Sequence, residues 1–473
     1  MPKRNSLWGN IDWVTVSLFL ALVFLGWINI YAAVYNNEHQ NIFDISQQYG
    51  KQLIWIGAAL VLAFTILIIE SNFYVVFSYI IYGFIVFLLI LVLFVGKEIN
   101  GARSWFGVGN FRLQPSEFCK FATALALARY MSSYGFKLQK FKSLVIIAAI
   151  ILAPAAFIII QNDTGSALVY LSFVLVLYRE GLSGVVLFFG TLVGVLFVLA
   201  LVISNLVLSL VLLALALAAY FIFNPKTKVF LRIVSIYAAC IVVFVAGEYF
   251  LSMKYEIADA INLGLITGSL ITIVYGLRKR IPNFATISLV FLGSILFTIS
   301  VDYGFNNLLE AHHQRRINSL LGIESDPLGA DYHVNQSKIA IGSGGFLGKG
   351  FLKGTQTKYD FVPEQSTDFI FCTVGEEWGF LGTFVLVALF VFLFIRLVWL
   401  AERQRSVFSR IYGYSVAVIL FFHFVVNIGM TIGVMPVIGI PLPFFSYGGS
   451  SLWSFTILLF IFIRLDASRY EKF

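Results

Sequence analysis

Long apolar stretches alternate with short polar gaps along almost the whole chain. An α-helix needs about 20 apolar residues to cross the hydrocarbon core of a bilayer. Fourteen stretches reach or approach this length, and they cover residues 12–34, 52–69, 73–95, 117–132, 143–160, 166–178, 183–203, 205–223, 230–247, 257–276, 284–302, 368–395, 409–432 and 445–464. The pattern predicts an all-α polytopic integral membrane protein.

Lys and Arg residues gather in alternate polar gaps, and this orients the chain in the membrane. Cytoplasmic loops carry an excess of both residues, so we expect a cytoplasmic N-terminus. The clusters then placed inside lie at residues 129–142, 226–228, 278–280, 396–410 and 464–469. An error of one span would move several clusters outside. The first stretch follows Met1 and two basic residues without a small-residue cleavage site, which predicts a retained span rather than a signal peptide.

The same orientation places two larger segments on the outer face, near residues 96–116 and 302–367. The second is far longer than any other connection, and long ordered loops are usually functional. Residues 181–302 are nearly all Leu, Val, Ala, Ile and Phe, and we interpret them as lipid-facing scaffold. The expected parts of the chain are a first membrane part (1–180), this hydrophobic segment (181–302), an outer loop (303–367) and a second membrane part (368–473).

Composition supports lipid as the main solvent of the chain. Hydrophobic residues make up 60% and charged residues only 12%, whereas about a quarter of a soluble domain is charged. The net charge of +8 follows the orientation pattern, so we expect no nucleic-acid partner. The three cysteines show no CxxC spacing and the five histidines no metal-binding pair, which argues against a disulfide framework or a zinc site.

The first outer segment and the stretch after it hold several polar candidates. Trp105 is either an interfacial anchor or part of a site, and Lys120 either extends toward the membrane surface or takes part in chemistry. Arg103 and Glu117 lie beside them. Asp163 interrupts two apolar runs, where an ionisable residue is a functional candidate or a helix N-cap.

The second outer segment is rich in glycine and lysine before it reaches Asp368. Five glycines fall within residues 342–350, and such residues let backbone N–H groups approach an anion closely. Lys338, Lys349 and Lys353 add positive charge, although no P-loop motif is present. Asp368 is either a simple helix N-cap, a role that Thr367 could also fill, or a carboxylate at the mouth of an outer cavity.

Four sequence blocks resemble the SEDS family (shape, elongation, division and sporulation), and within it the RodA type. They are GARSW with QPSEFCKF at 101–121, QNDTGSAL at 161–168, the run from QRRINSLL to VPEQSTDFIF at 314–371, and NIGMTIGVMPVIGIPLPFFSYGGSS at 427–451. The match covers about residues 1–180 and 303–473. It implies a helical bundle of ten core spans, to which this chain adds about four within 181–302. Ser366 stands where the family usually has His, and Asn162 where it has Pro.

The resemblance implies a peptidoglycan glycosyltransferase of the bacterial inner membrane, with its active site on the outer face. Family members transfer a growing glycan from undecaprenyl pyrophosphate to lipid II and form β-1,4 glycan strands during cell elongation. The resemblance implies Asp368 as general base, because a carboxylate can take the proton of the attacking hydroxyl. It also implies a class B penicillin-binding transpeptidase as partner.

The residues expected on the substrate side of this site are Arg103, Trp105, Glu117, Lys120, Asp163, Arg315, Lys338 and Glu364. Pyrophosphate is a good leaving group, so one base with cations suffices. The cations come from Arg103, Lys120, Arg315 or Lys338, or from a divalent ion such as Mg²⁺; no other cofactor is expected. Two rival functions are a lipid II flippase and a non-catalytic scaffold of the wall-synthesis complex.

Overall fold

The computed structural model describes residues 7–35, 41–99, 101–108, 111–251, 257–307, 314, 318, 332–359 and 361–469. Two compact units make up the chain. One combines residues up to 182 with those from 326 onward, and the other runs from 183 to 325. Each unit is described by itself.

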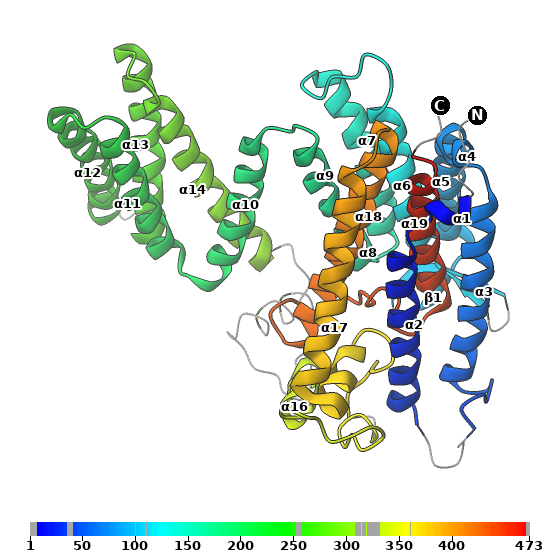
Figure 1. Ribbon diagram of the computed structural model, residues 1–473. Helices are drawn as coiled ribbons and strands as arrows, with labels where there is room; N and C mark the ends of the chain where they lie inside the picture. Colours follow the sequence, from blue (N-terminus) through cyan, green and yellow to red (C-terminus); the bar gives the residue numbers. More distant parts are fainter. Residues whose placement is uncertain are drawn as a thin grey trace. The chain divides into compact units, whose positions relative to one another are not determined.

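The first unit is a helical bundle (Figure 1). Its helices are α1 (Leu7–Asn10), α2 (Trp13–Ala33), α3 (Gln48–Ile68), α4 (Ser71–Val76), α5 (Ser78–Val95), α6 (Pro115–Met131), α7 (Phe141–Ile160), α8 (Thr164–Leu168), the 3₁₀ helix η1 (Val169–Ser172), α9 (Phe173–Arg179), α16 (Tyr332–Ser343), α17 (Ile370–Glu402), α18 (Val407–Thr431) and α19 (Gly449–Ala467). Helices α6, α18 and α19 are the most buried. They therefore carry the polar groups that the bundle hides from lipid.

All fourteen predicted segments contain helix, but two of them are short for a membrane span. Within the described residues, twelve helices are long and apolar enough to cross a membrane. The exceptions are α6, with 17 residues, and residues 164–179, which are divided into α8, η1 and α9. The fold class, a polytopic helical membrane protein, is confirmed.

The second unit contains five long apolar helices. They are α10 (Gly184–Val202), α11 (Asn205–Phe223), α12 (Thr227–Leu251), α13 (Ile257–Lys279) and α14 (Phe284–Asn307). The last four of them, α11 to α14, share a core of their own. Gly264 and Gly268 let α13 approach Ile241 and Tyr237 of α12 closely, as small residues four apart do between membrane helices. The unit thus has its own packing contacts.

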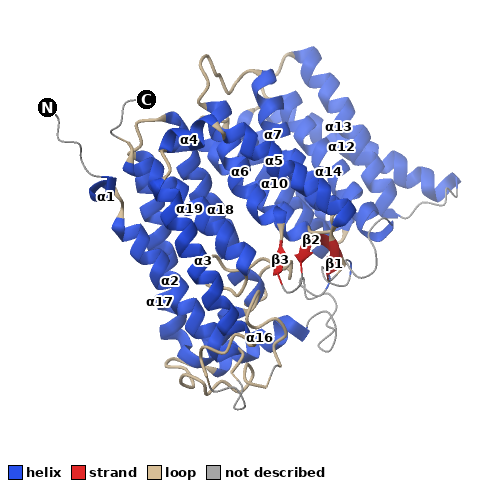
Figure 2. Ribbon diagram, turned by 90° about the vertical axis from the view of Figure 1, so that its right-hand side faces the viewer, coloured by secondary structure: helices blue, strands red, loops and turns tan. Residues whose placement is uncertain are grey.

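The first outer segment folds as a three-stranded antiparallel sheet, which the sequence pattern did not predict (Figure 2). Its strands are β1 (Lys97–Ile99), β2 (Ala102–Val108) and β3 (Phe111–Leu113). The N–H of Arg103 donates to the carbonyl of Gln161 at 3.1 Å. This bond joins the sheet to the turn between α7 and α8, which carries Asp163.

Candidate active site

Asp368 lies in the turn that leads into α17, and it is not the cap of that helix. The N-cap position is Phe369, and no side chain makes a capping hydrogen bond there. The Thr367 hydroxyl instead donates to Glu364 Oε2 at 2.9 Å. The N-cap alternative for Asp368 and Thr367 is therefore wrong, and another reason is needed for a carboxylate at this position.

The backbone around Asp368 is fixed by three consecutive hydrogen bonds to its carbonyls. The donors are Tyr447 N to Ser366 O (2.9 Å), Ser446 Oγ to Thr367 O (2.6 Å) and Asn427 Nδ2 to Asp368 O (2.8 Å). Ser366, which replaces the usual histidine, donates its hydroxyl to Gln48 Oε1 of α3 at 2.6 Å. These bonds fix the backbone position of residues 366–368, from which the Asp368 side chain extends.

The Asp368 carboxylate itself is half-buried, and no hydrogen bond from the described residues reaches it. Burial raises the pKa of Asp368 to about 7, and the negative charges of Glu364, Asp163 and Glu117 add to this rise. A general base works best when its pKa lies near the working pH. Asp368 has both the pKa and the open lone pairs that proton abstraction requires.

Lys120 is buried in a cluster with Glu117 and His423, and it does not extend toward the membrane surface. Its Nζ lies 2.8 Å from Glu117 Oε1 and 2.9 Å from His423 Nε2, and all three side chains are at most 3% exposed. The snorkelling alternative is therefore wrong. A charge so buried is stable only with partners. His423 was missed from the sequence, although an ionisable residue in an apolar stretch is a signal in itself.

Asp163 is the N-cap of a helix, which is one of its two predicted roles. Its Oδ1 accepts from the N–H of Ser166 at 3.1 Å, which caps α8. Its Oδ2 accepts from Gln114 Nε2 at 2.8 Å and lies 3.4 Å from the Ser116 hydroxyl. Asp163 thereby joins α8 to the start of α6, and its charge also acts on Asp368.

Of the four other predicted residues, two are exposed, one is half-buried and one lies outside the described residues. Arg103 is exposed and Trp105 half-buried, two positions apart on β2, and they therefore share one face of the strand. Lys338 is exposed on α16, with its Nζ beside Gly433. Arg315 lies outside the described residues. The substrate roles of these residues stay predictions.

The glycine-rich segment repairs a break in α17. Helix α17 is interrupted at Gly379, where φ is +63°. The N–H groups of residues 349 and 350 donate to the carbonyls of Glu376 and Glu377, both at 3.0 Å. In return, the N–H groups of residues 380 and 381 donate to the carbonyls of residues 345 and 346. Backbone groups freed inside a membrane protein need such partners.

The anion that the next N–H groups surround belongs to the protein. The Glu376 carboxylate is fully buried and accepts from Lys349 Nζ at 2.7 Å. It also accepts from the backbone N–H groups of Thr355, Gln356 and Thr357 at 2.7–2.9 Å. These N–H groups belong to residues 355–357 and not to the glycines at 342–350, and the anion that they bind is a side chain of the protein itself. An anion site formed by the five glycines stays a prediction. The Glu376 carboxylate fastens the outer loop to the helix that follows Asp368.

A family model described as "Cell cycle protein" (FTSW_RODA_SPOVE) matches residues 12–213 and 208–471. The chain belongs to this family. It is 32% identical to the peptidoglycan glycosyltransferase RodA of Treponema pallidum (strain Nichols), over 97% of this chain and 98% of the relative. It is 30% identical to the peptidoglycan glycosyltransferase MrdB of Escherichia coli (strain K12), over 95% of this chain and 92% of the relative. The predicted family is thereby confirmed.

Two solved structures share the fold. One, titled "Structural coordination of polymerization and crosslinking by a peptidoglycan synthase complex", has a TM-score of 0.61 and 26% identity, and the match covers 98% of this chain and 99% of the other. The crystal structure of the Thermus thermophilus rod shape determining protein RodA has a TM-score of 0.56 and 23% identity, and covers 98% of both chains. The second likeness supports the fold alone.

Proposed function

We propose that this chain is a peptidoglycan glycosyltransferase of cell elongation that polymerises lipid II into β-1,4 glycan strands, with Asp368 as general base. Relatives that align over nearly its whole length are named peptidoglycan glycosyltransferases. The observation that carries the residue assignment is the Asp368 carboxylate, half-buried, with a pKa of about 7 and a pinned main chain.

The proposed reaction is a single displacement at the sugar carbon that bears the pyrophosphate. The 4-hydroxyl oxygen of the acceptor attacks the anomeric carbon, and its proton passes to Asp368. The bond from this carbon to the phosphate oxygen breaks, and the electron pair leaves with undecaprenyl pyrophosphate. The anomeric configuration inverts from α to β. Glycosidases need a second carboxyl as acid because an alkoxide leaves poorly, and pyrophosphate removes that need.

The candidate cations differ in whether they already have partners within the protein. Lys120 is already bonded to Glu117 and His423, so it fixes the local structure rather than contacting phosphate directly. Arg103 and Lys338 are exposed and remain able to pair with pyrophosphate. Arginine and lysine both suit phosphate oxygens.

A divalent ion such as Mg²⁺ fits this site only with help from the substrate. Within the described residues, no group of three His, Cys, Asp or Glu side chains could hold a metal. Mg²⁺ commonly takes one or two carboxylates together with substrate phosphates. Glu364, whose charge acts on Asp368, would be the carboxylate in that arrangement, so that Asp368 stays free as the base. The ion would neutralise pyrophosphate charge.

The proposed orientation puts the N-terminus in the cytoplasm and Asp368 on the outer face. Helix α16 lies at one end of the first unit, and both termini lie at the other (Figure 1). The predicted inside cluster 396–410 belongs to the end with the termini. We further propose a class B penicillin-binding transpeptidase as partner, supported by the structural likeness to a subunit of a peptidoglycan synthase complex.

The deciding experiment compares glycan strand formation from purified lipid II by the native chain and by Asp368→Asn in detergent. We expect a rate about 10²–10⁴-fold lower in the variant, the usual worth of a general base, with an unchanged melting temperature. Glu402→Gln is the control, because it removes a carboxylate from an exposed ion pair with Arg179.

The same assay separates the rival functions. A flippase forms no polymer in detergent, where no second compartment exists. A scaffold forms none without a partner's transglycosylase. Near-native polymerisation by Asp368→Asn would contradict the base assignment.

A further inference from the structure

His423 and Asn427 stand one turn apart on α18, and each side chain bridges two groups. Both are buried, with at most 1% of their surface exposed. Side chains four apart on a helix lie on one face. The two side chains should therefore bond to groups that lie close together, and the partners of each side chain meet this expectation.

His423 joins Lys120 to the backbone of the loop between α18 and α19. Its Nε2 lies 2.9 Å from Lys120 Nζ, and its Nδ1 lies 3.3 Å from the carbonyl oxygen of Pro441. A lysine ammonium has only donors, so Nε2 must accept. The proton of the neutral imidazole is then on Nδ1, where it is donated to Pro441.

Asn427 joins Asp368 to the neighbouring residue of the same loop. Its Nδ2 donates to the carbonyl of Asp368 at 2.8 Å and to the carbonyl of Ile440 at 2.7 Å. Residue 439 is a glycine with φ of +69°, and a Cβ there would lie 3.5 Å from Asp368 Oδ2. The loop therefore runs directly past the Asp368 carboxylate.

We propose that His423 and Asn427 are positioning residues, which together set Lys120 and its partner Glu117 relative to Asp368. The two bridges meet on adjacent carbonyls, of Ile440 and Pro441, and start from one rigid helix turn. Displacing either side chain moves the loop beside the carboxylate. This proposal rests on the proposed function of Asp368.

The plain alternative is that both side chains serve stability alone. Buried polar groups need hydrogen bonds wherever they occur, and losing one costs free energy of unfolding. Asn29 provides the comparison, because its Nδ2 also donates to a backbone carbonyl, of Leu25 at 2.8 Å. Asn29 and Asn427 are both buried, and in both the Oδ1 atom lacks a partner among the described residues. The Asn29 bond stays within α2 and does not involve Asp368.

The test measures lipid II polymerisation by His423→Phe, Asn427→Leu and their double variant, with Asn29→Leu as control. A misplacement of about 1 Å can cost about 10²-fold in rate. We expect kcat to fall by about 10- to 100-fold in each single variant, with KM for lipid II changed less than twofold. The kcat of the double variant should be little lower than that of either single variant, because both substitutions release the same loop at residues 440–441.

Two further variants separate positioning from stability. His423→Gln retains an acceptor for Lys120 and a donor for Pro441, so we expect most of the lost kcat to return. Asn427→Ser is a milder change that cannot reach both carbonyls, and it serves if Asn427→Leu does not fold. Asn29→Leu should keep native kcat even if its melting temperature changes.

Native kcat in the folded His423 and Asn427 variants would overturn the proposal, as would a loss that His423→Gln fails to rescue. Asp368→Asn distinguishes this failure from that of the proposed function. If Asp368→Asn is inactive while the two α18 variants are native, only the positioning role is wrong. If Asp368→Asn is active, the base assignment itself is wrong.

Discussion

A carboxylate must be ionised before it can accept the proton of an attacking hydroxyl. For Asp368 this requirement is met only at about neutral pH and above, because burial raises its pKa to about 7 and three acidic neighbours add to the rise. The rate should therefore fall as the pH drops below about 7 and the carboxylate becomes protonated. The same burial makes the ionised form a stronger base, but it also narrows the pH range over which Asp368 is ionised.

We predict that Glu364→Gln moves the acidic limb of the pH profile to lower pH. Glu364 is the largest electrostatic contribution to the raised pKa of Asp368, after burial. Removing its negative charge favours the ionised form of Asp368, which lowers that pKa and keeps the base active in more acidic buffer. The measurement is kcat/KM for lipid II against pH. A limb that stays in place, or moves upward, would show that another group controls it.

At the scale of elements, the outer loop and α17 are built as one piece. The break at Gly379 frees backbone groups that the glycine-rich loop satisfies, and Glu376 then binds the next stretch of that loop. Thr357 and Glu376 are thereby held together, and Asp368 lies on the stretch of chain between them. Closing this stretch at its two ends limits how far Asp368 can move.

We predict that Glu376→Gln loosens this closure. The substitution keeps the size of the side chain but removes the charge that balances Lys349 and faces three backbone donors. Breaking one side of a buried ion pair costs about 3–5 kcal/mol. Melting in detergent and limited proteolysis between residues 349 and 359 measure the effect. Glu402→Gln, at an exposed pair, should change stability by less than about 1 kcal/mol. If both variants had the same melting temperature, Glu376 would not hold the loop to α17.

The elements were predictable from the sequence to the extent that they depend on local pattern. Apolar length marked the spans, because lipid forces every span to satisfy its own backbone. The partners of polar residues were not predictable in this way. Lys120 and His423 lie 303 positions apart. The break at Gly379 follows Glu376 and Glu377, which interrupt the predicted apolar stretch 368–395. These residues could mark an irregular site, but they do not identify residues 345–350 as the segment that docks there.

The site was predicted in its residues more than in its contacts. Asp368 and Asp163 could be named from the sequence, yet local pattern alone did not separate their cap roles from catalysis. The structure assigns the cap to Asp163 and removes it from Asp368. The strands of residues 97–113 were missed because each is short and the segment is rich in glycine.

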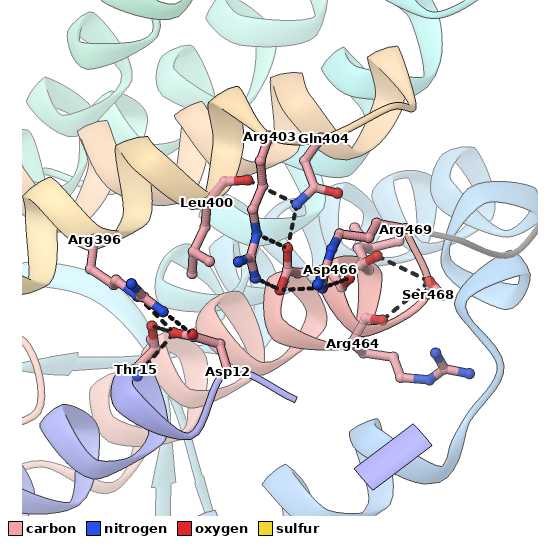
Figure 3. A network of polar contacts seen from close by, with 11 residues as sticks. Asp12, Thr15, Arg396, Leu400, Arg403, Gln404, Arg464, Asp466, Ser468 and Arg469 are labelled. Carbon is pink, nitrogen blue, oxygen red and sulfur yellow. Dashed lines mark hydrogen bonds and ion pairs between the residues drawn. The ribbon is translucent and has the colours of Figure 1, made fainter. Parts of the chain in front are cut away.

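At the scale of the whole molecule, ion pairs hold the helix ends opposite the outer loop. Figure 3 shows Arg403 paired with Asp466 of α19, which also accepts from Gln404 at 2.7 Å. Arg396 pairs with Asp12 at the start of α2. Basic residues that take part in such contacts serve both orientation and packing. The bundle is thus fastened at both ends, by Glu376 near the outer loop and by this network near the termini.

The proposed orientation depends on an odd number of crossings between the basic loop after α6 and the outer loop. Helix α7, the divided stretch 164–179 and the five helices of the second unit give seven. Five helices in place of one family span leave this count odd, so the second unit does not invert the outer loop. The two faces can therefore be tested with one cysteine on each.

We predict that Lys353→Cys reacts with a membrane-impermeant maleimide in intact spheroplasts, whereas Lys140→Cys reacts only after the membrane is permeabilised. Both side chains are exposed, so access to reagent should differ only by membrane side. The unsubstituted chain is the control for its own cysteines, of which Cys119 and Cys372 are buried. Labelling of both positions from outside would mean an even number of crossings. In that case residues 164–179 would not span the membrane, and Asp368 would need a second test of its side.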